Sequence, residues 1–317
     1  MRIAILGAGA MGSLFGGLLA EHGEAVTLID VNDAHLDAIR RDGLRIDDDR
    51  GERRIRALQA VRPEAVNGAS AAAGASPDTP FDLLIVFTKS LHTRAALDGV
   101  RALLTPQTFV LTLQNGLGNV ETLNAFVPLE RILVGVTTWP ADFAGAGHVR
   151  SHGAGTIRMM TADGAARPFA AAVADALSRA GLACALDADV WAAIWEKVAF
   201  NAALNTLCAA TGCTVDQLGR EPDGPRLALA IAAETAAVAR AKGIAVDGER
   251  IARNIEHAIH AHRGHRPSML QDVLAGRRTE IDAISGQVVA AARETGVAVP
   301  HTDTLLALVR LIDARRD

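Results

Sequence analysis

The first 187 residues alternate short apolar runs with amphipathic segments, whereas the pattern after residue 187 is helical throughout. Runs of four to seven mainly apolar residues, bounded by glycine or polar residues, are typical of buried parallel strands. The order strand, helix, strand, helix at the start of the chain indicates a doubly wound sheet. Strands are predicted at 3–6, 25–29, 81–87, 109–113, 132–136 and 183–186, and helices at 11–21, 33–40 and 168–180.

Turn-forming residues and helix signals divide this first part further. Asp33 is a candidate N-cap for the second helix, which should stop near Gly43. Charged and apolar residues alternate over 44–61, which predicts a short hairpin, and a second hairpin is expected over 149–160 at the far side of the sheet. The small, turn-rich segment 65–80 indicates a loop or a weak helix.

After residue 187 the strand signals stop. Helical periodicity predicts helices over 190–210, 226–242, 247–262, 268–274, 280–295 and 302–313. The chain has 317 residues, which exceeds the roughly 250–300 at which single cores divide. We therefore predict an α/β N-terminal Rossmann domain with a doubly wound, mostly parallel sheet over 1–187, and an all-α C-terminal substrate and catalytic domain over 188–317.

Composition narrows the classes of function. Half of the residues are hydrophobic, only 3% are aromatic and none is tyrosine, so the core must be aliphatic and tyrosine is excluded as a catalytic acid. The net charge of −4 and the lack of a basic run argue against nucleic acid as a partner. The most apolar helix, over 227–241, is short and interrupted by charges, so no membrane association is expected.

The three cysteines, Cys184, Cys208 and Cys213, lack the spacing of metal ligands, so no metal site is expected. Buried free thiols suit a reducing compartment. Because the chain opens on a strand rather than on a signal peptide, we expect a cytoplasmic location. The apolar helices of the second part would suit a homodimer, and a buried core explains them equally well.

The loop after the first strand has the spacing G-x-G-x-x-G, formed by Gly7, Ala8, Gly9, Ala10, Met11 and Gly12. The first glycine permits a tight turn, the second lets a pyrophosphate approach the backbone, and the third lets helix and strand pack closely. The helix N-terminus then offers N–H groups to the phosphates. Because the loop follows a strand and opens a helix, it predicts a dinucleotide site rather than a glycine-rich turn without a ligand.

Asp30 stands at the end of the second strand, 18 residues after Gly12. A carboxylate here can accept hydrogen bonds from the adenosine ribose and would face the additional phosphate of NADP. Two like charges ~4 Å apart repel by ~1–4 kcal/mol, which favours NAD by roughly ten- to several-hundred-fold. Asp30 could instead touch nothing, and Arg40 or Arg41 downstream could in principle reach a phosphate.

Lys89 and Asn115 follow two successive strands at the carboxyl edge, where open α/β sheets bind ligands. Both could border the nicotinamide half of a cofactor. Lys89 could instead be a solvated loop lysine. Asn115 could instead be a turn former, since N-G is a common turn dipeptide.

Lys197, Asn201 and Asn205 are spaced i, i+4, i+8 in W-E-K-V-A-F-N-A-A-L-N. Each step of four residues turns a helical side chain by only about 40°, so the three share one stripe. The neighbouring positions are apolar, so the stripe is expected to face protein. A lysine in a partly dry cleft can lose pKa and become a proton donor near neutral pH, although a helix lysine in solvent is the alternative.

Several motifs together resemble the ketopantoate reductase family: the glycine loop, Q-N-G at 114–116, W-x-K-x-x-x-N-x-x-x-N at 195–205, P-S-M-x-Q-D at 267–272 and T-E-I-D at 279–282. The resemblance covers essentially the whole chain. It implies a Rossmann domain followed by a helical one. It also implies a 2-dehydropantoate 2-reductase-type oxidoreductase, which reduces a small-molecule 2-keto acid (ketopantoate to pantoate, in pantothenate biosynthesis) with NAD(P)(H).

The resemblance further implies roles in proton transfer. Lys197 matches the general acid that protonates the keto oxygen. Glu280 matches the acidic residue near the nicotinamide ribose and the lysine, where it would hold the ammonium group charged and aimed. Glu280 could instead cap its own helix.

The remaining matches concern substrate and cofactor. Asn201 and Asn205 match residues that contact the substrate hydroxyl and orient the lysine, and Ser268 matches a hydroxyl that binds the substrate carboxylate. An N-cap role for Ser268 would be compatible with that function. Asn115 matches an asparagine between cofactor and substrate, and Lys89 matches a lysine on the cofactor side.

Two departures from the family pattern bear on cofactor and substrate. NADP is the family norm, and many NADPH-using members have an arginine where this chain has Asp30 and Val31. A further family asparagine downstream of Asn205 is replaced by Thr214 and Val215. An NAD-dependent D-2-hydroxyacid dehydrogenase, similar to D-mandelate dehydrogenases, is therefore an alternative. A non-catalytic dinucleotide sensor is a more remote one.

Overall fold

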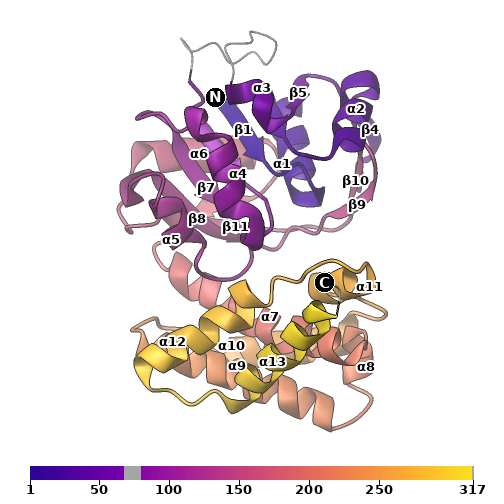
Figure 1. The fold of residues 1–317 in the computed structure, drawn as a ribbon, viewed down its shortest axis with the longest axis vertical. Helices are drawn as coiled ribbons and strands as arrows, with labels where there is room; N and C mark the ends of the chain where they lie inside the picture. Colours follow the sequence, from indigo (N-terminus) through magenta and orange to yellow (C-terminus); the bar gives the residue numbers. More distant parts are fainter. Residues whose placement is uncertain (68–79, 316–317) are drawn as a thin grey trace. The chain divides into compact units, whose positions relative to one another are not determined.

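The computed structural model describes residues 1–67 and 80–315 and divides into two compact units (Figure 1). The first comprises Met1–Gln114 and Asn119–Val190, and the second comprises Asn115–Gly118 and Trp191–Asp317. The first unit is α/β with a mostly parallel sheet and the second is helical, so the predicted fold class is confirmed. The functional boundary predicted at residue 187 stays a prediction. The association of Asn115–Gly118 with the helices was not predicted.

The large sheet of the first unit has the strand order β12-β11-β8-β7-β6-β1-β2-β5 in the described part of the chain. The pairing of β8 with β11 is antiparallel and the other neighbours run parallel. The inner strands are apolar on both faces because helices cover both sides. The strands are β1 Arg2–Leu6, β2 Ala25–Ile29, β5 Leu58–Val61, β6 Leu83–Val86, β7 Phe109–Thr112, β8 Ile132–Thr137, β11 Ile157–Thr161 and β12 Cys184–Leu186.

The helices of this unit follow the predicted order, with one correction to a cap. The N-cap of α2 is Asn32, whose side chain accepts the His35 N–H at 3.2 Å, so the prediction of Asp33 is wrong by one residue. Asp33 is the first helical residue, where its charge favours the helix dipole. Gly43 ends the helix as predicted. The described helices are α1 Ala10–Glu21, α2 Asp33–Asp42, α3 Pro63–Asn67, η2 Ser90–His92, α4 Thr93–Gly99, η3 Arg101–Leu103, α5 Asn119–Asn124, η4 Leu129–Arg131 and α6 Pro168–Arg179.

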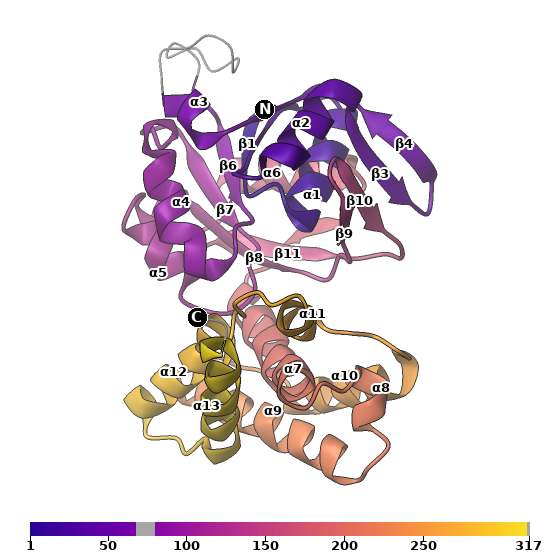
Figure 2. The same cartoon turned by 45° about the vertical axis from the view of Figure 1, so that its right-hand side comes forward.

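A second, smaller sheet in the same unit has the order β4-β3-β10-β9 (Figure 2). The strands β3 (Leu44–Asp48) and β4 (Gly51–Ile55) form the predicted hairpin. They are joined by β9 (Asp142–Gly145) and β10 (His148–Ser151).

The predicted hairpin over 149–160 is wrong, because β10 pairs with β3 and β9 whereas β11 pairs with β8 and β12 in the large sheet. Gly153, with φ of +95°, and Gly155 break the extended run between the two strands. Strand periodicity alone does not identify a strand's partner. Of the segment predicted as a loop or weak helix, 68–79 lies outside the described residues.

The second unit is built on the long helix α7 (Val190–Thr211), which has apolar residues around its circumference and is largely buried. The short helix α8 was not predicted, and the helix predicted over 280–295 begins as a π-helical turn, η5. No described helix has the length and apolar character to cross a membrane. The other helices are α8 Val215–Leu218, α9 Asp223–Ala241, α10 Gly248–Ala261, α11 Ser268–Leu274, η5 Asp282–Gly286, α12 Gln287–Thr295 and α13 Pro300–Ala314.

Candidate functional site

The three glycines of the loop after β1 stand in different surroundings. A Cβ atom on Gly12 would lie 1.9 Å from the Gly7 carbonyl oxygen, and a Cβ on Gly7, whose φ is +96°, would lie 2.6 Å from the Thr88 nitrogen. A Cβ on Gly9 would meet no atom within 4 Å. Packing within the protein therefore demands Gly7 and Gly12, whereas Gly9 borders open space. The first N–H groups of α1 lie beside that space, which fits the pyrophosphate of a dinucleotide.

The loop lies where ligands bind in doubly wound sheets. In the strand order, β1 lies between β2 and β6. The chain therefore extends the sheet first to one side of β1 and, from β6 onward, to its other side. The loop after β6 touches the glycine loop through Thr88. Lys89 follows Thr88 and its ammonium nitrogen is buried, which contradicts the interpretation as a solvated lysine. The Gln114 amide at the end of β7 donates to the Thr88 carbonyl and to Thr93 Oγ1.

Asp30 is held by the backbone rather than isolated. Its Oδ2 accepts the Ala8 N–H at 2.6 Å, and its Oδ1 accepts the N–H groups of Val31 and Asn32 at 2.8 and 2.9 Å. The alternative in which this aspartate touches nothing is therefore wrong. The carboxylate joins the end of β2 to the first turn of the glycine loop.

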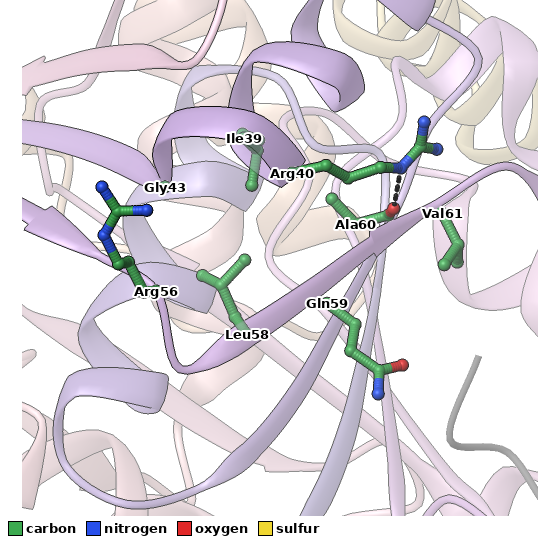
Figure 3. Close-up of a pocket in the computed structure, with 8 residues that line it drawn as sticks. All are labelled: Ile39, Arg40, Gly43, Arg56, Leu58, Gln59, Ala60 and Val61. Atoms are coloured by element: carbon green, nitrogen blue, oxygen red, sulfur yellow. Dashed lines mark hydrogen bonds between the residues drawn. The ribbon is translucent and has the colours of Figure 1, made fainter. Parts of the chain in front are cut away.

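The arginines near this end of the sheet are engaged with neighbours. Arg40 pairs with Asp37 at 2.6 Å and donates its Nε to the Ala60 carbonyl at 2.8 Å (Figure 3). Arg41 pairs with Asp42. Both arginines are therefore ion-paired locally.

Arg62 was missed by the sequence reasoning. It follows β5, and its side chain reaches the residues after β2. Its Nη1 donates to the Val31 carbonyl at 3.2 Å and to Asp33 at 2.7 Å, and its Nε pairs with Glu64. These two carboxylates raise the pKa of the guanidinium. The cation at this end of β2 is thus balanced by acidic neighbours.

A hollow of about 420 Å³ lies between the end of α2 and strand β5, at the open edge of the large sheet (Figure 3). None of the residues predicted for the site lines it. The lining residues are Ile39, Arg40, Gly43, Arg56, Leu58, Gln59, Ala60 and Val61.

The polar stripe on α7 lies within the second unit. Asn201 and Asn205 are only 7% and 6% exposed, and Lys197 is half-buried, so the alternative of a lysine in solvent is wrong. Burial lowers the pKa of Lys197 to about 8, and the negative charge of Glu280 opposes this shift. An ammonium group with this pKa is mostly protonated at pH 7 and can still release its proton readily.

Ser268 meets the same stripe from another helix. It is the first residue of α11, it is exposed, and Pro267 is the N-cap, so the proposed N-cap role of Ser268 is wrong. The Asn205 amide lies 3.5 Å from Ser268 Oγ and can donate to it. Residues 63 positions apart are therefore brought together.

Glu280 is positioned by contacts of its neighbours. Asp313 on α13 accepts the N–H of Thr279 at 3.2 Å and its hydroxyl at 2.6 Å. On the other side of Glu280, the π-helical turn begins at Asp282 and has Ile281 as its N-cap, with no side-chain capping bond. The Glu280 carbonyl accepts the N–H groups of Ala283 and Ile284 at 3.1 Å each, so its backbone takes part in the start of this turn and the interpretation as a cap stays open. Sequence reasoning missed Asp313, because nothing local connects it to a residue 34 positions away.

The segment that carries Asn115 docks on this turn. The Leu117 N–H donates to the Ala283 carbonyl at 2.8 Å, and a Cβ on Gly116, with φ of +84°, would lie 2.3 Å from the same oxygen. Single π-helical turns of this kind are frequent at functional sites. Asn115 therefore belongs with Glu280 in the second unit, where the chain bends over 115–118.

Thr214, in the region where the resemblance implies an asparagine, forms a helix cap. It is the N-cap of α8 in a capping box with Gln217, and its hydroxyl donates to Asp216 at 2.7 Å. A threonine at this position thus has a structural role of its own.

These two groups of residues, on a Rossmann sheet and on a helical unit, define a dinucleotide-dependent oxidoreductase. Residues 3–164 match the family model of ketopantoate reductase PanE/ApbA, and residues 189–313 match the model of its C-terminal domain. The chain belongs to the ketopantoate reductase family.

Curated relatives are similar over their whole length. The 2-dehydropantoate 2-reductase of Halobacterium salinarum is 36% identical over 319 residues, covering 100% of both chains. The enzyme of the same name from Streptococcus pyogenes serotype M1 is 31% identical, covering 99% of this chain and 98% of its own.

Solved structures are similar to this chain over nearly its whole length. A ternary structure of D-mandelate dehydrogenase with NADH and anilino(oxo)acetate has a TM-score of 0.90 at 32% identity, covering 100% of this chain and 99% of that one. The 2-dehydropantoate 2-reductase of Geobacter metallireducens has a TM-score of 0.89 at 30% identity, covering 98% and 99%.

Proposed function

We propose that this protein reduces a 2-keto acid with a nicotinamide dinucleotide, with ketopantoate as the first substrate to test and Lys197 as the general acid. The observation that carries the proposal is the half-buried lysine, whose pKa is lowered to about 8, in electrostatic contact with Glu280. On the same helix, two buried amides extend the polar stripe toward Ser268.

Each group then has a task in the reaction. A bound nicotinamide would supply the hydride that adds to C2 of the keto acid. Lys197 donates its proton to the keto oxygen as negative charge develops there. Glu280 keeps the ammonium group charged, Asn201 and Asn205 orient the substrate hydroxyl and the lysine, and Ser268 binds the carboxylate.

We propose that the first unit holds the cofactor through the glycine loop, Asp30 and Lys89, with Asn115 as a contact from the second unit. NAD is favoured over NADP because the carboxylate of Asp30 would repel an additional phosphate. The acidic neighbours of Arg40, Arg41 and Arg62 support the same preference, because each of these guanidinium groups already has a carboxylate beside it.

A second candidate, an NAD-dependent D-2-hydroxyacid dehydrogenase of the D-mandelate type, is favoured by Asp30 and by the helix cap at Thr214. The experiment that separates the two is a four-way assay of NADH or NADPH with ketopantoate or benzoylformate. Fast turnover of ketopantoate with NADPH alone would overturn the preference for NAD. Binding of a dinucleotide without turnover of any 2-keto acid would instead indicate a sensor.

The role of Lys197 is tested by Lys197→Ala. We expect turnover to fall by about 10²–10⁴-fold, because the proton donor is lost, while NADH affinity stays within about twofold, because the variant leaves the glycine loop intact. Lys242→Ala, at an exposed ion pair with Glu294, is the matched control and should leave both unchanged. Near-normal turnover by Lys197→Ala would show that the acid assignment is wrong.

A cytoplasmic location completes the proposal. A homodimer stays a prediction, because the apolar side of α9 is buried within the single chain. The three cysteines form no disulfide, which suits a reducing compartment. Light scattering of the purified protein measures the oligomeric state directly.

A further inference from the structure

One buried histidine in the first unit has no place in the proposed mechanism. His35 lies on α2 and is 1% exposed. Its Nδ1 accepts the Gly147 N–H at 2.9 Å, and its Nε2 lies 3.0 Å from Ser13 Oγ. The Ser13 hydroxyl in turn donates to the Ala8 carbonyl at 2.7 Å. The chain of bonds therefore starts at the turn between β9 and β10 and ends in the glycine loop.

The donors and acceptors leave only one arrangement of protons. A backbone N–H can only donate, so Nδ1 of His35 carries a lone pair. Ser13 has one hydroxyl proton and gives it to Ala8, so Nε2 must carry the proton that Ser13 accepts. The ring must be neutral for this pattern, and burial lowers the pKa of His35, with the charge of Asp30 and the Ala8 carbonyl opposing.

The last of these hydrogen bonds, from Ser13 to Ala8, fixes the peptide unit between Ala8 and Gly9. That unit is planar and trans, so its C=O and N–H point in opposite directions. Because the buried Ser13 hydroxyl binds the carbonyl, the Gly9 N–H points away from Ser13. Around Gly9 there is also open space, since a Cβ on this residue would meet no atom within 4 Å. The preceding peptide unit is held as well, since the Ala8 N–H donates to Asp30.

The far end of the chain of bonds is equally constrained. Gly147 has φ of +68°, and a Cβ there would lie 2.9 Å from the Cβ of Ala38 on α2. Its carbonyl accepts the Arg45 N–H at 2.8 Å, which keeps the turn in register with β3. The small sheet therefore gives His35 a fixed point from which to hold Ser13.

We propose that His35, acting through Ser13, is a positioning residue that aims the Gly9 N–H at the pyrophosphate of the dinucleotide. This role rests on the proposed function of the glycine loop and extends it to the small sheet. The side chain of His35 needs no contact with the cofactor for this purpose. Through Ser13, His35 fixes the direction of the Gly9 N–H before the ligand binds. Less conformational entropy is then lost on binding.

Two amide substitutions test the two hydrogen bonds of the His35 ring one at a time. In His35→Gln the amide can reach Ser13 as Nε2 does, and in His35→Asn the shorter side chain can replace only the acceptor of Gly147. We expect NADH affinity, measured by fluorescence titration, to fall about three- to tenfold in His35→Asn and in Ser13→Ala, and to stay within about twofold in His35→Gln. The turnover number at saturating NADH should be unchanged in all three, because Lys197 and its neighbours are untouched.

His22→Gln, at the exposed C-terminal end of α1, is the matched control. Equal affinities for His35→Asn and His35→Gln would overturn the proposal, as would wild-type affinity in Ser13→Ala, which tests the same link without altering His35. Failure of the wild-type protein to bind either dinucleotide would overturn the proposed function and this role together. Wild-type binding with unaffected variants would overturn the role of His35 alone.

Discussion

The glycine loop and the polar stripe of α7 differ in which groups form the site and in how far apart these groups lie in the sequence. In the loop, backbone groups form the site, and its shape follows from positions where no Cβ fits, such as Gly7 and Gly12. On α7, side chains form the site, and a carboxylate and a hydroxyl reach the stripe from segments distant in sequence. The loop is a local structure with a fixed spacing, whereas the stripe acquires its chemistry from tertiary packing.

The two regions also differ in the free-energy cost of burying their polar groups. The loop satisfies its polar groups within the first unit, as Ala8 shows with a bond at both its N–H and its carbonyl. The stripe half-buries Lys197 and buries two amides, and burial of such groups costs free energy unless they are paired. Binding geometry is thus compatible with stability in the loop, whereas on α7 the lowered pKa of Lys197 itself reports a cost.

The largest expected effect tests whether the loop glycines serve packing or ligand. Gly12→Ala should lower the free energy of unfolding by about 3 kcal/mol or more, because the added Cβ meets backbone at 1.9 Å. Gly9→Ala should lower it by only about 1 kcal/mol, because Gly9 is the N-cap of α1 and alanine is a poorer N-cap than glycine. It should nevertheless weaken NADH binding at least about tenfold, because the methyl group enters the space for the pyrophosphate. Thermal melts and fluorescence titration measure the two quantities.

Gly23→Ala is a control for glycine replacement in this unit. Gly23 has φ of +91° and open space around its Cβ, so the variant carries backbone strain but should bind NADH normally. Wild-type NADH affinity in Gly9→Ala would show that the open space beside Gly9 is not the pyrophosphate site.

The comparison explains which features the sequence could predict. The glycine spacing, the strand before it and the helix after it are local, so the place of the loop between β1 and α1 and the fold class were predicted correctly, whereas the dinucleotide site stays a prediction. The i, i+4, i+8 spacing identified one face of α7. The Asp313 bond to Thr279 and the contact of Leu117 with Ala283 join distant segments, so no local pattern reveals them. The hairpin over 149–160 failed for the same reason, because a strand's partner is a tertiary choice.

The next effect concerns the pH dependence of the stripe. Reduction needs Lys197 protonated, so kcat/KM for reduction should be constant below the pKa of about 8 and fall about tenfold per pH unit above it. Glu280 raises this pKa against burial, so Glu280→Gln should move the break to lower pH. The measurement is a pH profile of kcat/KM with saturating NADH.

Glu294→Gln, which removes the exposed partner of Lys242, should leave the profile unchanged. A break that stays at the same pH in Glu280→Gln would show that Glu280 does not set the protonation of the acid. NADH affinity should not change with pH near this break, because Lys197 does not belong to the glycine loop that we propose as the cofactor site.

The smallest effect is a gain in stability when the catalytic group is removed. Lys197 has a pKa of about 8 in the folded protein and 10.5 as its ordinary value, so between these pH values the unfolded chain binds more protons. The free energy of unfolding therefore rises with pH across this window, and below it the folded state bears the full cost of the buried charge. Lys197→Met should remove that cost, partly offset by the unpaired Glu280, and stabilise the protein at pH 7 by about 1 kcal/mol.

Urea unfolding, followed by the fluorescence of Trp191 and Trp195 on α7, measures this gain. The advantage of Lys197→Met should shrink as the pH rises from 8 to 10.5, because the wild-type lysine then becomes neutral in the folded state. Lys242→Met, at an exposed ion pair, should change stability by less than about 0.5 kcal/mol at any of these pH values. A loss of stability in Lys197→Met at pH 7 would show that the stripe, like the loop, is built at no net cost to the fold.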